Sequence, residues 1–351
     1  MPVTVVVGGQ FGSEGKGKVV HFLAKQADTA ITVRVGGPNS GHTVYTPSGE
    51  RLVLRQLPAA AVLPGAYAVL GPGSYIDIAV LLRELELLNM PRERLLIDER
   101  AVIIESTERQ WERKSGLRSR IGSTETGTGA AVTRRIARDG RARLARDSMA
   151  LKRMVTNTSE FLRTKLTKGD RVIIEGTQGF GLSLVHSADY PFVTSRDTTA
   201  AGFVGEAGLS PLDVDQVVMV LRAFPIRVAG NSGPLPLETD WPTVTSEGNH
   251  DHDIQELTSV TKQVRRVANF EASVVRQAII VNTPTVVAMN HLDYLDHECC
   301  VTGRLTDIIR DFVARVERSI DHEIQLLGIG PTTIVDRDRS PRMALLARTS
   351  G

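Results

Sequence analysis

The sequence predicts an α/β fold with a mainly parallel central sheet and helices on both faces of that sheet. Short β-branched or apolar runs alternate along the chain with segments of helical periodicity, as in consecutive strand–helix–strand units. Glycine-rich turns follow several of these runs, at residues 8–9, 36–39 and 71–73. In a parallel sheet these turns meet at the carboxyl ends of the strands, where α/β proteins bind ligands.

Each element follows from its local pattern. Residues 3–7 form a continuous β-branched run, which is typical of a strand buried on both faces. Residues 16–26 place their apolar side chains on one side of a helix. A second helix, at residues 76–88, is ended by the following Asn89 and Pro91. Further strands are expected at residues 31–35, 69–70, 95–97, 102–104, 172–174, 217–221 and 285–289, and further helices at 150–166, 271–282 and 306–318.

Composition restricts the functional class. The chain has 351 residues, of which 41% are hydrophobic and 23% charged, as in ordinary soluble globular proteins. No internal repeat, low-complexity tract or linker interrupts it, so we expect one domain over residues 1–351 with long active-site loops. The formal net charge of +2 gives no global attraction to nucleic acid or to membranes, and we expect neither as a partner. Residues 109–146 are locally basic, which indicates either a solvated basic face or a lining for phosphates.

The cysteines and the amino terminus indicate the compartment. Cys299 and Cys300 are adjacent, so they cannot form an ordinary structural disulfide, and a reducing environment fits. Met1 leads almost directly into the first strand, without the pattern of a signal peptide. No apolar run approaches the length of a membrane span. We therefore expect a cytoplasmic protein, in the host cytoplasm if the chain is viral.

The glycine-rich segment 8–18, GGQFGSEGKGK, joins the first strand to the first helix. Glycines there let backbone amides turn toward an anion. The helix N-terminus and Lys16 add positive charge. The segment differs from a standard phosphate-binding loop because Gln10 and Gly17 replace its first glycine and its metal-binding hydroxyl. It predicts a P-loop-like nucleotide-binding fold, with a generic glycine turn as the alternative.

This loop resembles the signature loop of the adenylosuccinate synthetase family, and residues 36–43, GGPNSGHT, resemble the family's next turn. Further matches lie in family order at residues 121–124, 175–179, 190–195 and 198–200, and more weakly at 258–266 and 290–293. The length is closer to that of the compact archaeal and viral members. The resemblance implies a homodimeric, Mg²⁺-dependent ligase. In this family a triphosphate phosphorylates the 6-oxygen of a purine nucleotide, and L-aspartate then displaces the phosphate.

The resemblance also implies roles for individual residues. The catalytic residues would be Ser13, Lys16, His42 and Gln178, with His42 as a general acid or hydrogen-bond donor to the 6-oxygen. The triphosphate would contact Gly12, Glu14, Gly15, Lys16, Gly17, Gly41, His42, Thr43, Asn290, Asp293, Gly330 and Pro331. The purine monophosphate would contact Ser13, Asn39, Ser123, Thr124, Arg143, Gln178, Thr198, Thr199 and Gln263. Arg143, with Arg141 as the alternative, would reach the monophosphate from the second subunit. L-Aspartate would contact Ser259, Val260, Thr261 and Arg265, and Mg²⁺ would contact Ser13 and Gly41 besides phosphate oxygens.

Three positions depart from the ordinary family pattern. Ser13 stands where the family has an aspartate, which serves as the base on N1 and as a magnesium ligand. Gln263 replaces an arginine that contacts the ribose, and residues 290–293, NHLD, replace the TKLD that recognises the guanine of GTP. These changes resemble the phage branch of the family, which joins L-aspartate to dGMP on the way to 2-aminoadenine. That branch implies ATP or dATP as the phosphate donor. The alternatives are an ordinary enzyme that uses IMP and GTP, a catalytically silent nucleotide-binding protein and a P-loop-type kinase.

Overall fold

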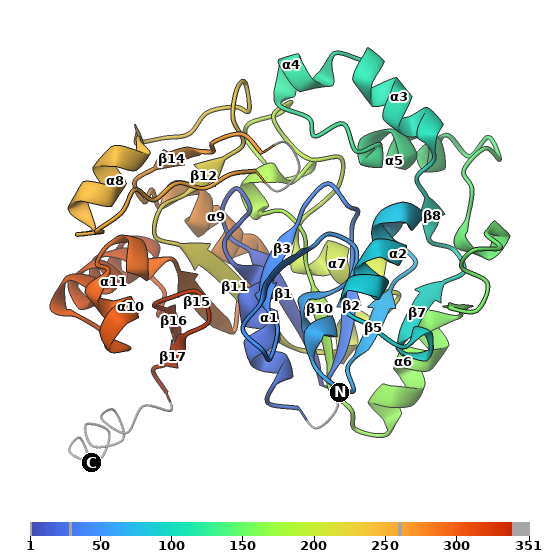
Figure 1. Cartoon of the computed structure of the whole chain (residues 1–351), viewed down its shortest axis with the longest axis horizontal. Coiled ribbons are helices and arrows are strands. Elements are labelled where there is room, and N and C mark those ends of the chain that lie inside the picture. Colours follow the sequence, from blue (N-terminus) through green and yellow to red (C-terminus); the bar gives the residue numbers. More distant parts are fainter. Residues whose placement is uncertain (1, 28–29, 259–261, 339–351) are drawn as a thin grey trace.

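The computed structural model describes residues 2–27, 30–258 and 262–338. Its largest element is a ten-stranded sheet in the order β17-β16-β15-β11-β1-β10-β2-β5-β7-β9 (Figure 1). All neighbouring strands in it are parallel except β17, which is antiparallel to β16. The strands are β1 (Val3–Gly8), β2 (Ile31–Arg34), β5 (Tyr67–Leu70), β7 (Leu95–Asp98), β9 (Val155–Thr156), β10 (Val172–Glu175), β11 (Val214–Arg222), β15 (Val286–Asn290), β16 (Leu326–Gly328) and β17 (Ile334–Asp336).

Both faces of the sheet are covered, because successive side chains of its strands point to opposite sides. Val5 and Val7 of β1 belong to one hydrophobic cluster, whereas Val6 belongs to the other. The first face packs against α6 (Thr158–Thr167), α7 (Ala200–Ala207), α9 (Ser273–Asn282) and α11 (Asp307–Ile320). The second packs against α1 (Lys16–Ala24), α2 (Ile78–Leu87), η1 (Ala59–Val62) and the hairpin of β3 (His42–Tyr45) and β4 (Arg51–Leu54). The predicted α/β fold with a mainly parallel sheet is confirmed.

Two groups of elements lie beyond the carboxyl ends of the strands (Figure 1). One contains α3 (Ser106–Lys114), α4 (Leu117–Ile121) and α5 (Thr128–Ala137). The other contains α8 (Trp241–Glu247) and a three-stranded antiparallel sheet of β12 (Ile226–Arg227), β14 (Arg266–Ala268) and β13 (Glu238–Thr239). The remaining short elements are η2 (Arg92–Arg94), η3 (Ala145–Asp147), η4 (Phe180–Leu182), η5 (Pro211–Asp213), η6 (Leu292–Tyr294) and α10 (Glu298–Thr302). No helix in the described part of the chain is both long enough and apolar enough to cross a membrane.

Two predicted elements differ from the structure. The expected helix at residues 150–166 begins only at Thr158, because Val155 and Thr156 extend the sheet as β9 beside β7. Asn157 then caps α6 by accepting a hydrogen bond from the Glu160 amide. The strand expected at 102–104 is β8 (Val102–Ile103), which pairs with β6 (Tyr75–Ile76) outside the main sheet. At residues 155–156, pairing with a distant strand overrode the local helical pattern. The strand predicted at 102–104 is confirmed, and only its place outside the main sheet was not expected.

Candidate active site

The loop between β1 and α1 is organised from the inside by one carboxylate. Glu14 is fully buried and accepts hydrogen bonds from the amides of Gln10 (3.2 Å) and Gly12 (2.7 Å). Lys16 forms an ion pair with Glu14 at 2.6 Å and also donates to the carbonyl of Gln178. Glu14 therefore shapes the loop from within. It lines neither of the two cavities that adjoin this loop and are described below, although we expected it to contact the triphosphate.

The start of α1 depends on a glycine. Gly15 caps this helix with a φ of +88°, a left-handed conformation that favours glycine. A Cβ atom at Gly15 would lie 2.7 Å from the side-chain nitrogen of Asn290. That nitrogen donates to the carbonyl of Glu14 at 2.9 Å, so β15 and the loop are held in direct contact.

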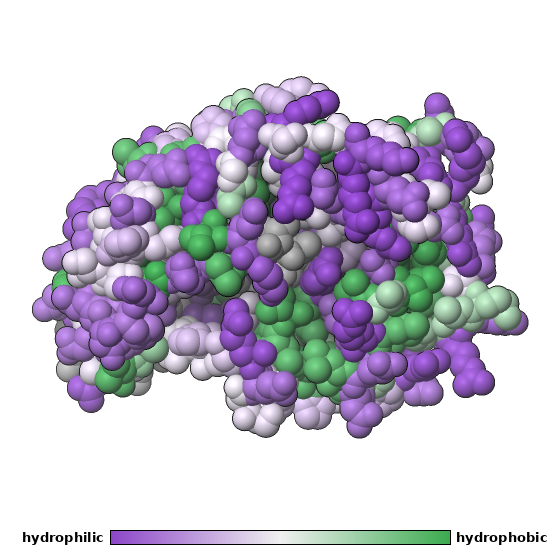
Figure 2. Space-filling model, turned by 45° about the horizontal axis from the view of Figure 1, so that its top comes forward, coloured by the Kyte–Doolittle hydropathy of each residue, from purple (hydrophilic) through white to green (hydrophobic). Residues whose placement is uncertain are grey.

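Two cavities meet at this loop, with volumes of about 620 Å³ and 500 Å³. Both are lined by Ser13, Lys16, Gly41, His42, Thr258 and Arg265. Figure 2 shows the molecule with the top of Figure 1 turned forward. Hydrophilic residues predominate over the upper part of this view, and a hydrophobic area lies below the centre of the view. The shared lining means that groups bound in the two cavities would meet beside Lys16 and His42.

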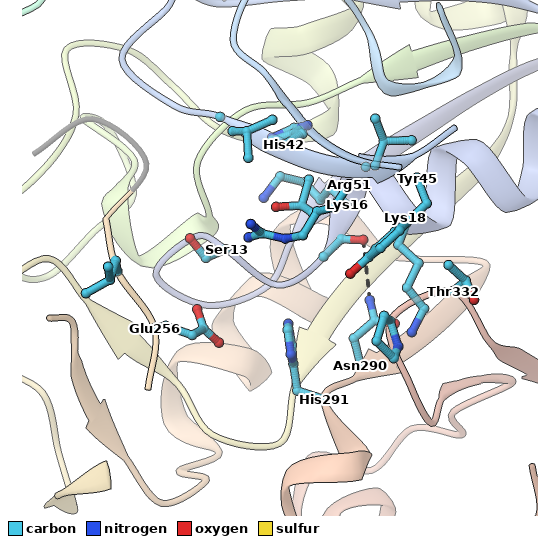
Figure 3. A pocket seen from close by; sticks show the side chains of 18 of the residues that line it. Ser13, Lys16, Lys18, His42, Tyr45, Arg51, Glu256, Asn290, His291 and Thr332 are labelled. Atoms are coloured by element: carbon cyan, nitrogen blue, oxygen red, sulfur yellow. Dashed lines mark hydrogen bonds between the residues drawn. The ribbon is translucent and has the colours of Figure 1, made fainter. Parts of the chain in front are cut away.

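The first cavity collects most of the residues expected to bind a triphosphate (Figure 3). Of the twelve, the ten that line it are Gly15, Lys16, Gly17, Gly41, His42, Thr43, Asn290, Asp293, Gly330 and Pro331. Gly12 lines the second cavity instead. Lys18 was not among the residues expected from the sequence, yet it lines the first cavity and its ammonium donates to the Gly330 carbonyl at 2.7 Å. Burial lowers the pKa of Lys18 to about 8, with Asp293 acting in the opposite direction.

The second cavity collects only part of the residues expected to bind a purine monophosphate. Those that line it are Ser13, Asn39, Ser123, Thr124 and Gln178. Those that line neither cavity are Arg143, Thr198, Thr199 and Gln263. Arg265 lines both cavities, whereas Ser259, Val260 and Thr261 lie outside the described residues.

Local hydrogen bonds and ion pairs engage several of the predicted site residues that line neither cavity. The hydroxyl of Thr198 donates to the Gly179 carbonyl at 3.0 Å. Thr199 caps α7 by accepting from the Gly202 amide. Arg143 contacts Glu105 at 3.2 Å, and the alternative Arg141 contacts Asp139 at 2.5 Å. Within this one chain neither arginine reaches the second cavity.

Ser13 stands at the junction of the two cavities in a constrained conformation. Its φ is +56°, a left-handed value that is uncommon for residues with a side chain. The guanidinium of Arg222, which is completely buried, donates to the Ser13 carbonyl at 2.9 Å and holds this backbone in place. The hydroxyl of Ser13 is thereby kept at the shared wall.

Arg222 also holds the carboxylate of Glu256, which lines the first cavity and was not expected from the sequence. Arg222 pairs with Glu256 at 2.5 Å. Burial raises the pKa of the Glu256 carboxyl, but the charges of Arg222 and His291 outweigh burial and lower that pKa to about 2. Glu256 is therefore ionised at neutral pH, on the Ser13 side of the cavity (Figure 3). Among the described residues, the second cavity has Glu112 as its one acidic side chain, and Glu112 accepts hydrogen bonds from the Gly127 and Ala130 amides.

His42 belongs to a buried polar cluster formed by strand ends. Its Nδ1 contacts both Arg34 and Glu175, which lie opposite each other in the register of β2 and β10. Arg34 and Glu175 are themselves 2.7 Å apart. Burial, aided by the charge of Arg34, lowers the pKa of His42 to about 4, although Glu175 acts in the opposite direction. At pH 7 His42 therefore presents a neutral imidazole, fixed in orientation by two charged neighbours.

This depressed pKa predicts a pH-dependent stability. Between its ordinary value of 6.5 and about 4, the unfolded chain binds a proton at His42 that the folded chain does not. The free energy of unfolding should therefore fall as pH falls through this window, and His42 should contribute up to about 3 kcal/mol of the loss at pH 4. Urea unfolding of wild type and His42→Gln at pH 4 to 7 measures this, with exposed His252→Gln as the control for removing an imidazole. Equal pH dependence of wild type and His42→Gln would contradict the assignment.

Taken together, the parallel sheet, the glycine loop at its strand ends and the two joined cavities define an α/β protein built to bring two ligands into contact. The family model described as adenylosuccinate synthetase matches residues 5–148 and 142–302. The chain belongs to the adenylosuccinate synthetase family, whose enzymes are carbon–nitrogen ligases.

Several relatives show the range of this similarity. The adenylosuccinate synthetase of Methanocaldococcus jannaschii is 36% identical over 335 residues, covering 93% of this chain and 94% of the relative. That of Pyrococcus horikoshii is 35% identical over 346 residues, covering 96% and 99%. Among solved structures, the fully ligated adenylosuccinate synthetase of Plasmodium falciparum shares the fold, with a TM-score of 0.85, 18% identity and coverage of 96% and 100%. Cyanophage S-2L succinoaminodeoxyadenylate synthetase, bound to dGMP and to dATP as an energy donor, has a TM-score of 0.80, 29% identity and 99% coverage of both chains.

Proposed function

We propose that this chain joins L-aspartate to C6 of dGMP with cleavage of ATP or dATP, giving N6-succino-2-amino-2′-deoxyadenylate. The observation that carries the proposal is Ser13, which stands at the junction of the two cavities where an ordinary family member has an aspartate. The cyanophage synthetase, which was solved with dGMP and dATP, supports this reading. The curated archaeal relatives favour the second candidate, an ordinary enzyme that uses IMP and GTP.

The position of Ser13 gives this specificity a physical basis. Guanine carries an amino group at C2, next to N1, that hypoxanthine lacks. A serine leaves more room at this point than an aspartate, and its hydroxyl accepts a hydrogen bond from the amino group. Because the Ser13 backbone is held by Arg222, the space is not recovered by a shift of the loop.

The proposed reaction has two balanced steps. In the first, the 6-oxygen of dGMP attacks the γ-phosphorus, the bond to the β-phosphate oxygen breaks, and the nucleoside diphosphate leaves. The proton on N1 passes to Gln178, the substrate or water. Lys16 and the loop amides stabilise the transferring group, while His42 and Gln178 hold the 6-oxygen. In the second step, the aspartate amine bonds to C6, the C6–oxygen bond breaks, and inorganic phosphate leaves with the proton that the amine loses. Arg265 binds an aspartate carboxylate.

The residues at the cavity junction fit a magnesium ion only together with a nucleotide. Among the described residues, no group of three or more His, Cys, Asp or Glu side chains is arranged to hold a metal. Ser13 and the Gly41 carbonyl are neutral oxygen ligands that would hold Mg²⁺ already bound to phosphate oxygens. The ion would supply charge neutralisation on the triphosphate. We further propose a two-fold homodimer in which Arg143 approaches the partner's monophosphate.

A substrate panel tests the proposal. Phosphate release is measured with L-aspartate, Mg²⁺ and each of dGMP, GMP, dIMP or IMP, combined with ATP, dATP or GTP. We expect dGMP with ATP or dATP to be the preferred pair, and phosphate release to require aspartate. Preference for IMP with GTP would establish the ordinary reaction. The nucleoside diphosphate is measured in parallel: its formation without aspartate and without phosphate release would indicate a kinase. Formation of neither product with any pair would indicate a silent nucleotide-binding protein.

Ser13→Asp is expected to shift the preference. The ratio of kcat/KM for dGMP to that for IMP should fall by about 100-fold or more, because the carboxylate crowds the C2 amine and supplies the missing base on N1. Ser119→Asp, on α4 and outside both cavities, is the matched control for an added carboxylate. An unchanged ratio in Ser13→Asp would show that Ser13 does not set the specificity.

A further inference from the structure

We propose that Arg120 binds the 5′-phosphate of the purine nucleotide from within the same chain. This inference rests on the proposed function only in assuming that the second cavity takes a nucleoside monophosphate. Arg120 lines that cavity together with the hydroxyl residues Ser123 and Thr124. From the sequence we expect the cationic part of this site to be Arg143 or Arg141, but each of these contacts a carboxylate of its own chain.

The backbone at Arg120 is built to hold this position. Arg120 lies at the end of α4, which is closed by Gly122 with a φ of +71°. The side-chain amide of Asn231 donates to the Arg120 carbonyl at 3.0 Å. Gly122 lies so close to Val228 and Ser232 that a Cβ atom would come within 3.2 Å and 3.3 Å of them. The turn that carries Arg120 is thus fixed against the segment after β12, even though the arginine side chain is exposed.

Charge balance distinguishes Arg120 from the other cations around the second cavity. Arg227 pairs with Asp189, Arg265 lies 3.9 Å from Glu256, and Lys16 pairs with Glu14. In the described part of the chain, Arg120 has no carboxylate partner for its guanidinium. Its neighbour Arg118, in contrast, lies 3.5 Å from Glu125 and does not line the cavity. Arg120 is therefore the one described cation of this lining without an ion-pair partner, whereas the acidic side chain of the lining, Glu112, accepts hydrogen bonds from the Gly127 and Ala130 amides.

The surrounding wall suits a phosphate dianion. Besides Ser123 and Thr124, the hydroxyl residues Thr126, Thr128 and Thr133 line the same cavity. The hydroxyls of Thr126 and Thr128 are 3.1 Å apart, so they form part of a connected set of donors. A planar guanidinium with its donors free binds two phosphate oxygens at once. Together, these hydroxyl donors and Arg120 would supply both the hydrogen bonds and the charge that a monophosphate requires.

The experiment compares a nucleotide with its nucleoside. Dissociation constants for dGMP and deoxyguanosine, and for IMP and inosine, are measured by calorimetry on the full chain. We expect Arg120→Gln to weaken dGMP and IMP by about 10- to 100-fold and to leave both nucleosides within about twofold. Arg120→Lys should recover part of the loss. Arg118→Gln, on the same helix, is the matched control and should leave all four affinities unchanged.

The outcomes separate this inference from the choice of purine. Wild-type preference for IMP would refute dGMP specificity, yet the loss of IMP affinity in Arg120→Gln would still support the phosphate role. Equal weakening of nucleotide and nucleoside would overturn it, because the effect would then not concern phosphate. Unchanged dGMP and IMP affinities in Arg120→Gln would overturn it too, as would a wild type that binds neither nucleotide. A loss in Arg143→Gln without one in Arg120→Gln would assign the phosphate to the partner's arginine alone.

Discussion

Replacing Lys16 by methionine is expected to lower kcat/KM for ligation by about 1,000-fold. Lys16 is nearly fully buried, and it lines both cavities at the point where they meet. A donor that faces charge developing on a transferring phosphoryl group contributes about 100- to 1,000-fold to the rate in other enzymes. Lysine supplies a full charge there, so we expect the upper end of that range. Initial-rate measurements of phosphate release give the effect.

A second variant separates this role from the part that Lys16 plays in folding. The ammonium is the ion-pair partner of Glu14, whose carboxylate is completely buried. Lys16→Met alone leaves that charge unpaired, at a cost of about 3 kcal/mol in the free energy of unfolding. The double variant Lys16→Met/Glu14→Gln should regain most of the stability and none of the activity. Recovery of activity in the double variant would mean that Lys16 acts only through the shape of the loop.

The central part of the fold was predictable because buried parallel strands have a distinctive pattern. The β-branched run of β1 and the glycines after it place a strand, a turn and a helix in one short segment. The same pattern at residues 31–35 and 172–174 predicted two further strands, and the structure pairs them as β2 and β10, an adjacency that the pattern did not give. Glycine turns at strand ends therefore indicated the edge of the sheet where the cavities lie.

Charged residues at strand ends indicate buried ion pairs, and we did not predict those pairs from the sequence. Arg34, Glu175 and Arg222 are the last residues of β2, β10 and β11. A charge that directly follows a buried apolar run has to find a partner, and the neighbouring parallel strands offer one at the same level. Arg34 and Glu175 do pair in this way. Glu256, by contrast, lies in an irregular segment, and no local pattern indicated that it would meet Arg222.

Some site assignments depended on three-dimensional contacts that spacing alone does not give. Thr198 and Thr199 belong to a family motif, yet their hydroxyls are used in hydrogen bonds around the start of α7. Arg120 is one of many basic residues between 109 and 146, and what distinguishes it is that it lines the second cavity and has no acid partner. Which basic residue reaches the cavity is decided by packing between segments.

Glu175→Gln is expected to have the largest effect on stability in this site. Glu175 is completely buried and balances Arg34, which is nearly so. It also accepts a hydrogen bond from the Ala59 amide at 2.7 Å. Removing one partner of a buried ion pair leaves the other charge uncompensated, which costs about 3 to 5 kcal/mol. Urea unfolding at pH 7 measures the loss. Glu238→Gln is the matched control, because Glu238 pairs with Arg266 at the surface and should contribute less than about 1 kcal/mol.

The double variant Arg34→Met/Glu175→Gln then decides whether charge is the cause. If the loss in Glu175→Gln comes from the unpaired guanidinium, removing that guanidinium should restore part of the free energy of unfolding. If the double variant instead loses as much stability as the Arg34→Met and Glu175→Gln variants lose together, the effect comes from packing and from the hydrogen bond to Ala59. His42 gives an independent readout, since its ring contacts both charges. Glu175→Gln removes the carboxylate that favours the imidazolium, so the pKa of His42 should fall further. The rate of ligation should then fall together with the free energy of unfolding.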